Sequence, residues 1–268
     1  MKKFSVSDDF ESFYRKKGYV VLTDVFEPEE LTCVRDDIHS LWETRFEPID
    51  SGELSGDELI TEYYNSHSEE WGQCASEMWN LPSVARLAPK ETVLTAIQKA
   101  GIKQPIMTSR PQVRVDMPED DQFRIPWHQD WRFGQGSLNS VTMWIPHHGV
   151  TAENGAIDAK PGTHTLGYLD VKKETNPRRF IIESNEIDDY SEVTMELDLG
   201  EVVLFSQFLA HQSGYNSTND PRITTQIRYS DYTDQRFIEE GYPSPSSSEM
   251  EVTWDQPPTR DDLETVFR

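Results

Sequence analysis

The sequence predicts a mainly β fold with flanking helices, and three features of the chain support that prediction. Between residues 106 and 235 there are five short runs of β-type residues, at 112–116, 141–145, 192–197, 201–205 and 223–229. Turn-forming residues separate these runs, for example Asn154-Gly155 and Pro161-Gly162. No long helical pattern interrupts this region, whereas helical patterns dominate residues 1–105. Short strands without intervening long helices are typical of a β-sandwich or a barrel.

The first 42 residues are predicted to form a helix, a strand and a second helix. Phe10, Phe13 and Tyr14 share one helical face, and Gly18 is suited to end that helix. Residues 19–22, Tyr-Val-Val-Leu, are typical of a short buried strand. The next helix begins near residue 28, where a proline and two glutamates suit a first turn. Its apolar residues recur at the helical period, at Leu31, Val34, Ile38, Leu41 and Trp42.

Three further segments complete the predicted organisation. Residues 48–70 are polar and acidic and are predicted to form a long loop. Residues 81–100 are predicted to be helical, with a break at Pro89. Residues 243–248, Pro-Ser-Pro-Ser-Ser-Ser, indicate an irregular segment before an acidic C-terminus.

Composition excludes several classes of partner. The net charge is −23, from 25 Lys and Arg against 48 Asp and Glu, and it would repel phosphate backbones and anionic lipid headgroups. No apolar run approaches the roughly 18 residues that span a bilayer, and the N-terminal residues do not resemble a signal peptide. Cys33 and Cys74 are too few for a disulfide framework. We therefore expect a cytoplasmic protein with a small-molecule substrate, no nucleic-acid or membrane partner, and a monomeric or weakly homo-oligomeric state.

One pattern in the predicted β region points to a metal. His128-Gln129-Asp130 and the distant His211 supply two imidazoles and one carboxylate. This is the ligand set of a non-haem Fe(II) site with open coordination positions. A His-x-Asp pair alone is common by chance, and a single His211 would ordinarily be a core histidine, so the pattern depends on its surroundings. Arg222 follows His211 by eleven residues and offers a cation for a co-substrate carboxylate.

Several ordered motifs over residues 10–235 resemble the phytanoyl-CoA dioxygenase-like family. Gly18-Tyr19-Val20-Val21-Leu22 and the following helix match its start. The middle of the family pattern is matched by Trp127-His128-Gln129-Asp130, Trp144-Ile145-Pro146, Asn154-Gly155 and Pro161-Gly162-Thr163-His164. The end of the family pattern is matched by His211-Gln212-Ser213-Gly214, Asn216 and Pro221-Arg222. The resemblance implies a double-stranded β-helix (jelly-roll, cupin-like) core that uses Fe(II), 2-oxoglutarate and O2. On this interpretation residues 1–268 form one domain, with a supporting part at 1–105, the jelly roll at 106–235 and an extension at 236–268.

The resemblance also implies roles for individual residues. His128, Asp130 and His211 are the implied catalytic metal ligands, and Arg222 and Ser213 the implied contacts of the far carboxylate of 2-oxoglutarate. Trp144 matches an aromatic wall beside the co-substrate, although core packing explains it equally well. Gln112 falls near an upstream contact position. His164 is expected to brace its loop, and His147 and His148 are not expected to take part.

The expected reaction is hydroxylation with release of succinate and CO2. Desaturation, ring closure and epimerisation stay open, because these outcomes depend on how the substrate is placed. Asp130 occupies the position that halogenating relatives leave to a small residue, so halogenation is not favoured. Six arginines near the predicted ligands favour a small anionic or polar substrate, such as a sugar acid, an amino acid or a phosphonate: Arg110, Arg114, Arg124, Arg132, Arg222 and Arg228.

Four alternatives remain open at this point. Two belong to the same family, an acyl-CoA hydroxylase and a natural-product hydroxylase. The third is a metal-binding jelly roll without turnover. The fourth is a zinc-dependent cupin isomerase, because two histidines and a carboxylate also suit zinc. Such an isomerase would have no use for a dicarboxylate-binding pair such as Arg222 and Ser213.

Overall fold

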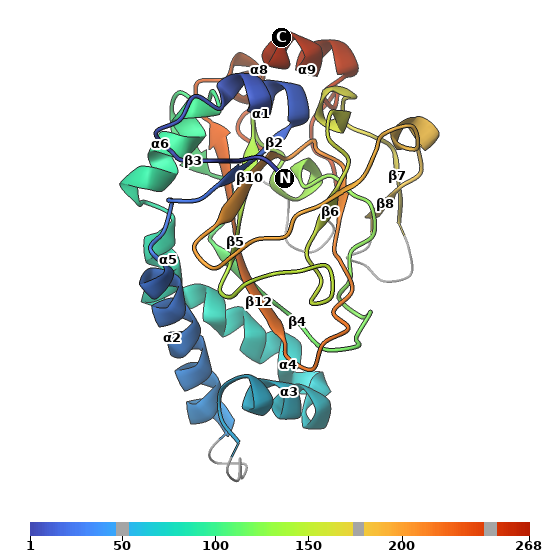
Figure 1. The fold of residues 1–268 in the computed structure, drawn as a ribbon. Helices are drawn as coiled ribbons and strands as arrows, with labels where there is room; N and C mark the ends of the chain where they lie inside the picture. The colour runs from blue at the N-terminus through green and yellow to red at the C-terminus, as the bar shows by residue number, and fades with distance from the viewer. Residues whose placement is uncertain (47–53, 174–179, 244–250) are drawn as a thin grey trace.

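The computed structural model describes residues 1–46, 54–173, 180–243 and 251–268. Figure 1 shows a large sheet with helices on one side and shorter strands on the other. The predicted irregular segment at 243–248 lies outside the described residues except for its first position. Within the described part of the chain, no helix combines the length and apolar character needed to cross a membrane.

The larger sheet has seven strands and forms the backbone of the fold. Its order is β1-β2-β10-β5-β12-β3, and β4 pairs with β12 as well. All neighbouring pairs are antiparallel except β1 with β2. The strands are β1 (Lys3–Phe4), β2 (Tyr19–Leu22), β3 (Pro105–Met107), β4 (Gln112–Asp116), β5 (Val141–Pro146), β10 (Val202–Ser206) and β12 (Arg222–Asp231).

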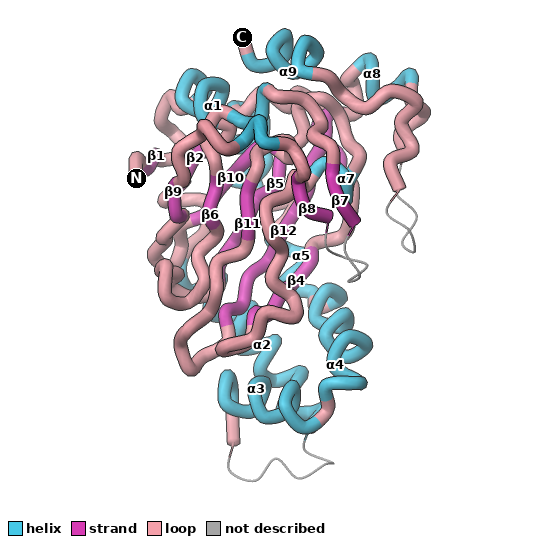
Figure 2. The backbone as a smooth tube through the Cα atoms, turned by 90° about the vertical axis from the view of Figure 1, so that its right-hand side faces the viewer, coloured by secondary structure: helices cyan, strands magenta, loops and turns pink. Residues whose placement is uncertain are grey.

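A second sheet of three strands covers one face of the first. Figure 2 shows β9 (Val193–Thr194), β6 (Asp158–Ala159) and β11 (His211–Gln212) side by side across that face. A separate hairpin joins β7 (Val171–Lys173) to β8 (Phe180–Ile182). Two facing sheets with long connections confirm the predicted mainly β jelly-roll class, and the described residues form no closed barrel. The run at 192–197 is a strand only at its start, although Leu197 still bridges Val150.

Helices cover the opposite face of the large sheet (Figure 1). The structure confirms the predicted helix near residues 10–18, the helix beginning at Pro28 and the break at Pro89. The prediction of a loop over 48–70 is wrong for its described part, because Leu59, Ile60 and Tyr63 bury one helical face. The α-helices are α1 (Glu11–Lys17), α2 (Pro28–Phe46), α3 (Gly56–Ser66), α4 (Ser68–Ala75), α5 (Pro82–Leu87), α6 (Glu91–Lys99), α7 (Trp131–Gly134), α8 (Gln235–Glu239) and α9 (Arg260–Phe267).

The two faces of the large sheet have different chemistry because side chains alternate along each strand. On the helix side, apolar residues such as Val113, Met143 and Ile227 join the main hydrophobic core with the N-terminal helices. On the side of the small sheet, β2 and β10 contribute apolar residues, among them Val21 and Phe205. On the same side, β4 and β12 contribute a polar series, which is Gln112, Arg114, Asp116, Arg222, Thr224, Gln226 and Arg228. A buried polar half-face of this size indicates a functional site.

Candidate active site

Two distant segments of the chain bring the predicted metal ligands together. His128 and His211 form an isolated antiparallel bridge, in which the His128 N–H donates to the His211 carbonyl at 2.9 Å. The reciprocal bond from the His211 N–H measures 3.1 Å. The sequence predicts that His128 and Asp130 alternate on a strand or at its end, so that both side chains point to one face. His128 lies in this bridge, and Asp130 follows it outside the named strands. Asp130 has helical backbone angles (φ −70°, ψ −22°) because the chain turns there into α7, and this turn still directs its carboxylate to the imidazoles.

Backbone carbonyls fix the tautomer of both imidazoles. Nδ1 of His128 lies 2.7 Å from the carbonyl of Pro126, and Nδ1 of His211 lies 2.9 Å from that of Leu209. Because a carbonyl only accepts hydrogen bonds, each Nδ1 must carry the proton. Each Nε2 therefore presents a lone pair, the arrangement that metal-binding histidines require.

The third donor completes a compact, buried group. Oδ1 of Asp130 lies 3.7 Å from Nε2 of His128 and 3.9 Å from Nε2 of His211. Two atoms that each lie about 2.1 Å from one divalent ion are at most about 4.2 Å apart, so both distances fit a shared ion. Across the described ranges, these three residues are the only group of three or more His, Cys, Asp or Glu with ligand atoms all within 4.8 Å.

The electrostatics of the group favour metal binding. Burial, with a smaller contribution from His128, lowers the pKa of His211 to about 3, so its ring stays neutral near pH 7. Burial alone would raise the pKa of Asp130, but the Arg228 guanidinium and His128 hold that pKa well below its usual range. The site thus offers a neutral imidazole at His211 and an ionised carboxylate at Asp130, which are the protonation states that a divalent metal ion needs from these ligands.

Arg222 lies on β12, as predicted, with a side chain only 1% exposed. Its Nη2 pairs with Oδ2 of Asp116 at 2.6 Å. Burial would raise the pKa of Asp116, but Arg114 and Arg222 hold it below its ordinary value. Nε and Nη1 of Arg222 are buried and have no partner among the described residues. Unpaired buried donors on a planar guanidinium are suited to receive a carboxylate from a ligand.

Two glycines keep the backbone close to Arg222. A side chain at Gly155, which has a φ of +88°, would approach Nη1 of Arg222 to 3.1 Å. One at Gly214 would lie 2.2 Å from the carbonyl oxygen of Ala156. The Asn154-Gly155 turn and the segment after His211 therefore require glycine for space, which explains why both occur in recognisable motifs.

The other predicted co-substrate residues have different environments. Trp144 lies on β5 with its ring 5.7 Å from the Arg222 guanidinium. The Ser213 hydroxyl accepts a weak bond from the Ile125 N–H at 3.4 Å. Gln112 does not approach Arg222. Its Oε1 accepts from Nη1 of Arg228 at 2.7 Å, which connects Gln112 to Asp130 instead.

Sequence reasoning missed a hydroxyl beside Arg222. Thr224 follows Arg222 by two residues on β12, so the two side chains share one face of the sheet. Its Oγ1 is buried without a partner among the described residues. Strand alternation from Arg222 was the signal that could have identified it. His164, in contrast, donates from Nε2 to the Arg15 carbonyl (2.9 Å) and packs on Phe267, outside the metal group.

Most of the six arginines near the ligands are already paired with acids. Arg114 and Arg222 share Asp116, Arg124 pairs with Asp121, and Arg228 pairs with Asp130. Arg110 is exposed and bonds to Asn80. Only Arg132 combines partial burial with the absence of an acidic partner among the described residues.

Arg132 stands at the end of a row of aromatic rings that leads to the metal ligands. Its guanidinium lies 4.0 Å from the Phe180 ring centroid, and Nη1 donates to the Tyr168 hydroxyl at 2.7 Å. Phe180 lies 6.2 Å from Phe133, whose ring lies 6.0 Å from that of His128. These contacts connect the triad to an arginine that has no acidic partner among the described residues.

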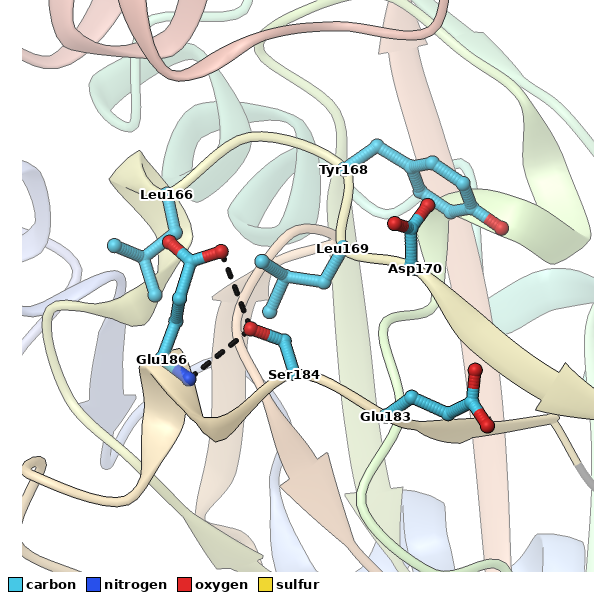
Figure 3. A pocket seen from close by; sticks show the side chains of 7 residues that line it. All are labelled: Leu166, Tyr168, Leu169, Asp170, Glu183, Ser184 and Glu186. Atoms are coloured by element: carbon cyan, nitrogen blue, oxygen red, sulfur yellow. Dashed lines mark hydrogen bonds between the residues drawn. The ribbon is translucent and has the colours of Figure 1, made fainter.

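A surface pocket includes Tyr168, the hydrogen-bond partner of Arg132, but contains none of the metal ligands (Figure 3). Its carboxylates are exposed, and Ser184 and Arg260 already bond to Glu186, at 3.1 and 2.7 Å. It shares no lining residue with the triad, since the lining residues are Leu166, Tyr168, Leu169, Asp170, Glu183, Ser184 and Glu186.

Comparison with known proteins agrees with this fold. The family model described as phytanoyl-CoA dioxygenase (PhyH) matches residues 14–224. The apo form of EctD from S. alaskensis has a TM-score of 0.61 at 13% identity, covering 96% of this chain and 88% of that one. The alpha ketoglutarate dependent epimerase SnoN from nogalamycin biosynthesis has a TM-score of 0.56 at 19% identity, covering 94% and 95%. The non-heme monooxygenase ThoJ has a TM-score of 0.59 at 17% identity, covering 83% and 77%.

Proposed function

The chain belongs to the phytanoyl-CoA dioxygenase family, and from that premise we propose that it hydroxylates a small anionic metabolite using Fe(II), 2-oxoglutarate and O2. One oxygen atom enters the substrate, and the other enters the succinate that forms as 2-oxoglutarate loses CO2. The observation that carries the proposal is a buried His-Asp-His group on the same sheet face as a guanidinium with two unpaired donors.

In this proposal His128, Asp130 and His211 hold the metal. One ligand atom of each of these residues lies within 4.8 Å of those of the other two, close enough for one ion to be shared. Phe205 packs on the His211 ring at 4.7 Å and limits its rotation. When bound, iron and 2-oxoglutarate together supply the oxidising power that breaks a substrate C–H bond.

Arg222 is proposed to bind the far carboxylate of 2-oxoglutarate through Nε and Nη1. Asp116 holds the guanidinium at its third nitrogen, so the fork is oriented before the ligand arrives. Thr224 offers a hydroxyl on this face of β12, and Trp144 provides an apolar wall. Ser213 remains the hydroxyl contact that the family resemblance implies. We propose Thr224 as a further hydroxyl contact, because its buried oxygen has no partner among the described residues. The Ser213 hydroxyl accepts a bond from the Ile125 N–H and keeps its own proton to donate to the carboxylate.

The substrate is proposed to be anionic because of Arg132. Burying a cation without a carboxylate beside it is costly unless a ligand supplies one. The aromatic row from Arg132 to His128 would bring a small molecule to the metal. We also propose that residues 1–268 work as one domain, because the main hydrophobic core includes both the N-terminal helices and the large sheet.

Substrate-stimulated succinate formation tests the function. The purified, iron-loaded protein is incubated with 2-oxoglutarate and either a panel of sugar acids, amino acids and phosphonates or a panel of acyl-CoA thioesters. We expect stimulation by members of the anionic panel. Stimulation by acyl-CoA thioesters alone would reject the substrate class. A complete lack of 2-oxoglutarate turnover, even without substrate, would indicate a binding protein.

Replacing Arg132 by glutamine should weaken the binding of such a substrate. A hydrogen bond to a charged group contributes about 1.5–3 kcal/mol, so we expect the KM to rise roughly 10- to 100-fold. The kcat, the affinity for 2-oxoglutarate and the Tm should change little, because Arg132 contacts neither the triad nor Arg222. Arg132→Lys keeps the charge and should give an intermediate KM. An unchanged KM in Arg132→Gln would exclude this contact.

A further inference from the structure

Asp130 is held by more than the metal group. Nη2 of Arg228 lies 3.1 Å from Oδ1 of Asp130, and Nε lies 3.3 Å from Oδ2, so one guanidinium contacts both carboxylate oxygens. Thr142 also donates to Oδ2, at 2.7 Å. Arg228 and Thr142 are direct neighbours across the β12–β5 ladder. The register of two central strands therefore places two donors behind the aspartate.

These contacts give the two carboxylate oxygens of Asp130 different surroundings. Oδ1 faces both imidazoles, at 3.7 and 3.9 Å from their Nε2 atoms. Oδ2 is directed to Thr142 and to Nε of Arg228. A carboxylate held in this way presents one oxygen to the space between the histidines. Rotation that would present both oxygens requires the loss of the Thr142 and Arg228 bonds.

The guanidinium of Arg228 is itself fixed by its neighbours. Nη1 donates to Oε1 of Gln112 at 2.7 Å, and Nη2 donates to Oε1 of Gln226 at 3.0 Å. Gln112 and Gln226 pair in the β4–β12 ladder, so the two amides come from adjacent strands. Each of the three Arg228 nitrogens has a partner, whereas Arg222 and Arg132 each have a buried nitrogen without a partner among the described residues. Such a network requires the planar fork of arginine, which lysine lacks.

The positive charge of Arg228 also compensates the negative charge of Asp130. Asp130 and Arg228 are 2% and 5% exposed, so neither charge is well solvated. Without a cation beside it, a buried carboxylate is strongly destabilising. We propose that Arg228 is a positioning residue that balances Asp130 while no metal is bound and holds it as a one-oxygen ligand. This inference rests on the proposed metal-binding function, since it assigns Asp130 the part of a ligand.

Cobalt(II) is a suitable probe because its visible absorption reports coordination geometry without turnover. The Tm and the Co(II) spectrum are measured for wild type, Arg228→Gln, Arg228→Lys and the exposed control Arg110→Gln, without 2-oxoglutarate. Each Tm is measured with and without Co(II). In metal-free Arg228→Gln, we expect the Tm to fall by several degrees. Co(II) should restore most of that loss, because the metal replaces the missing positive charge.

Arg228→Lys separates charge from geometry. Its metal-free Tm should stay close to that of wild type. Its Co(II) spectrum should differ, because an ammonium cannot reproduce the paired bonds of a guanidinium to both carboxylate oxygens of Asp130. Arg110→Gln should match wild type in both measurements. If Arg228→Gln does not fold, the double variant with Asp130→Asn should, because both charges are then gone. Failure of that double variant to fold would contradict the charge balance.

Other outcomes separate this inference from the proposed function. A loss of Tm in Arg228→Gln that persists unchanged with Co(II) would mean a merely structural arginine. An unaltered Co(II) spectrum in Arg228→Lys would reject the positioning of Asp130. Either result leaves the metal site intact. If Co(II) does not raise the Tm of wild type, or raises that of His211→Ala equally, the metal site itself is wrong.

Discussion

Replacing His211 by alanine is expected to abolish Fe(II) binding and, with it, all oxidation of substrate. His211 supplies one of three donors, and its Nδ1 bond to the Leu209 carbonyl directs Nε2 toward Asp130. Residues that only support a ligand already contribute 10- to 100-fold to metal affinity or activity, so loss of a ligand should weaken Fe(II) by at least about 100-fold. The measurement is the visible charge-transfer absorption of oxygen-free protein with Fe(II) and 2-oxoglutarate, which should be absent from the variant.

A matched histidine separates this effect from general damage. His67 stacks on Tyr63 among the N-terminal helices and lies outside the metal group. His67→Ala should therefore retain the absorption of wild type. Since His211 is buried, circular dichroism of the metal-free His211→Ala protein should confirm that it folds. An undiminished absorption in His211→Ala would reject the metal assignment.

The pattern of polar and apolar residues predicted most of the strands and helices around this site. Strand β12 alternates Ile223, Ile227 and Tyr229 on the core side with Arg222 and Arg228 on the other, a pattern readable without a structure. That alternation also placed both arginines on one face. The grouping of the two histidines was predictable mainly because their order and neighbours resemble a known family. Spacing alone does not indicate that residues 128 and 211 form a bridge.

The ion pairs and hydrogen bonds within the site could not be predicted in the same way. The arginines near the ligands appeared to be a set of cations for an anionic substrate, but pairing depends on strand register, which brings Asp116 opposite Arg222. Asp130 lies where the chain turns into α7, so its side-chain direction depends on this turn and not on strand alternation. The acidic segment before α4 contains few apolar residues, and its helix is stabilised by contacts with α2 that local sequence does not reveal.

Replacing Arg222 by alanine should separate binding of 2-oxoglutarate from binding of iron. In this variant the far carboxylate of 2-oxoglutarate would lose its charged partner in a buried site, a loss of roughly 2–5 kcal/mol. That corresponds to an affinity about 30- to 4,000-fold weaker. The affinity for Fe(II) should stay nearly unchanged, because Arg222 bonds to Asp116 and not to a ligand of the triad. Arg114 still balances Asp116, which should allow the variant to fold.

Titration of Fe(II)-loaded, oxygen-free protein with 2-oxoglutarate measures the effect, and Fe(II) affinity is determined separately. Arg222→Lys should recover only part of the affinity, because a single ammonium cannot reproduce the Nε and Nη1 fork while also bonding to Asp116. Arg110→Ala removes an arginine from the surface and should bind 2-oxoglutarate as wild type does. Equal 2-oxoglutarate affinity in wild type and Arg222→Ala would reject the carboxylate contact. If Fe(II) affinity fell together with 2-oxoglutarate affinity, Arg222 would instead support the metal ligands, by contacts other than its bond to Asp116.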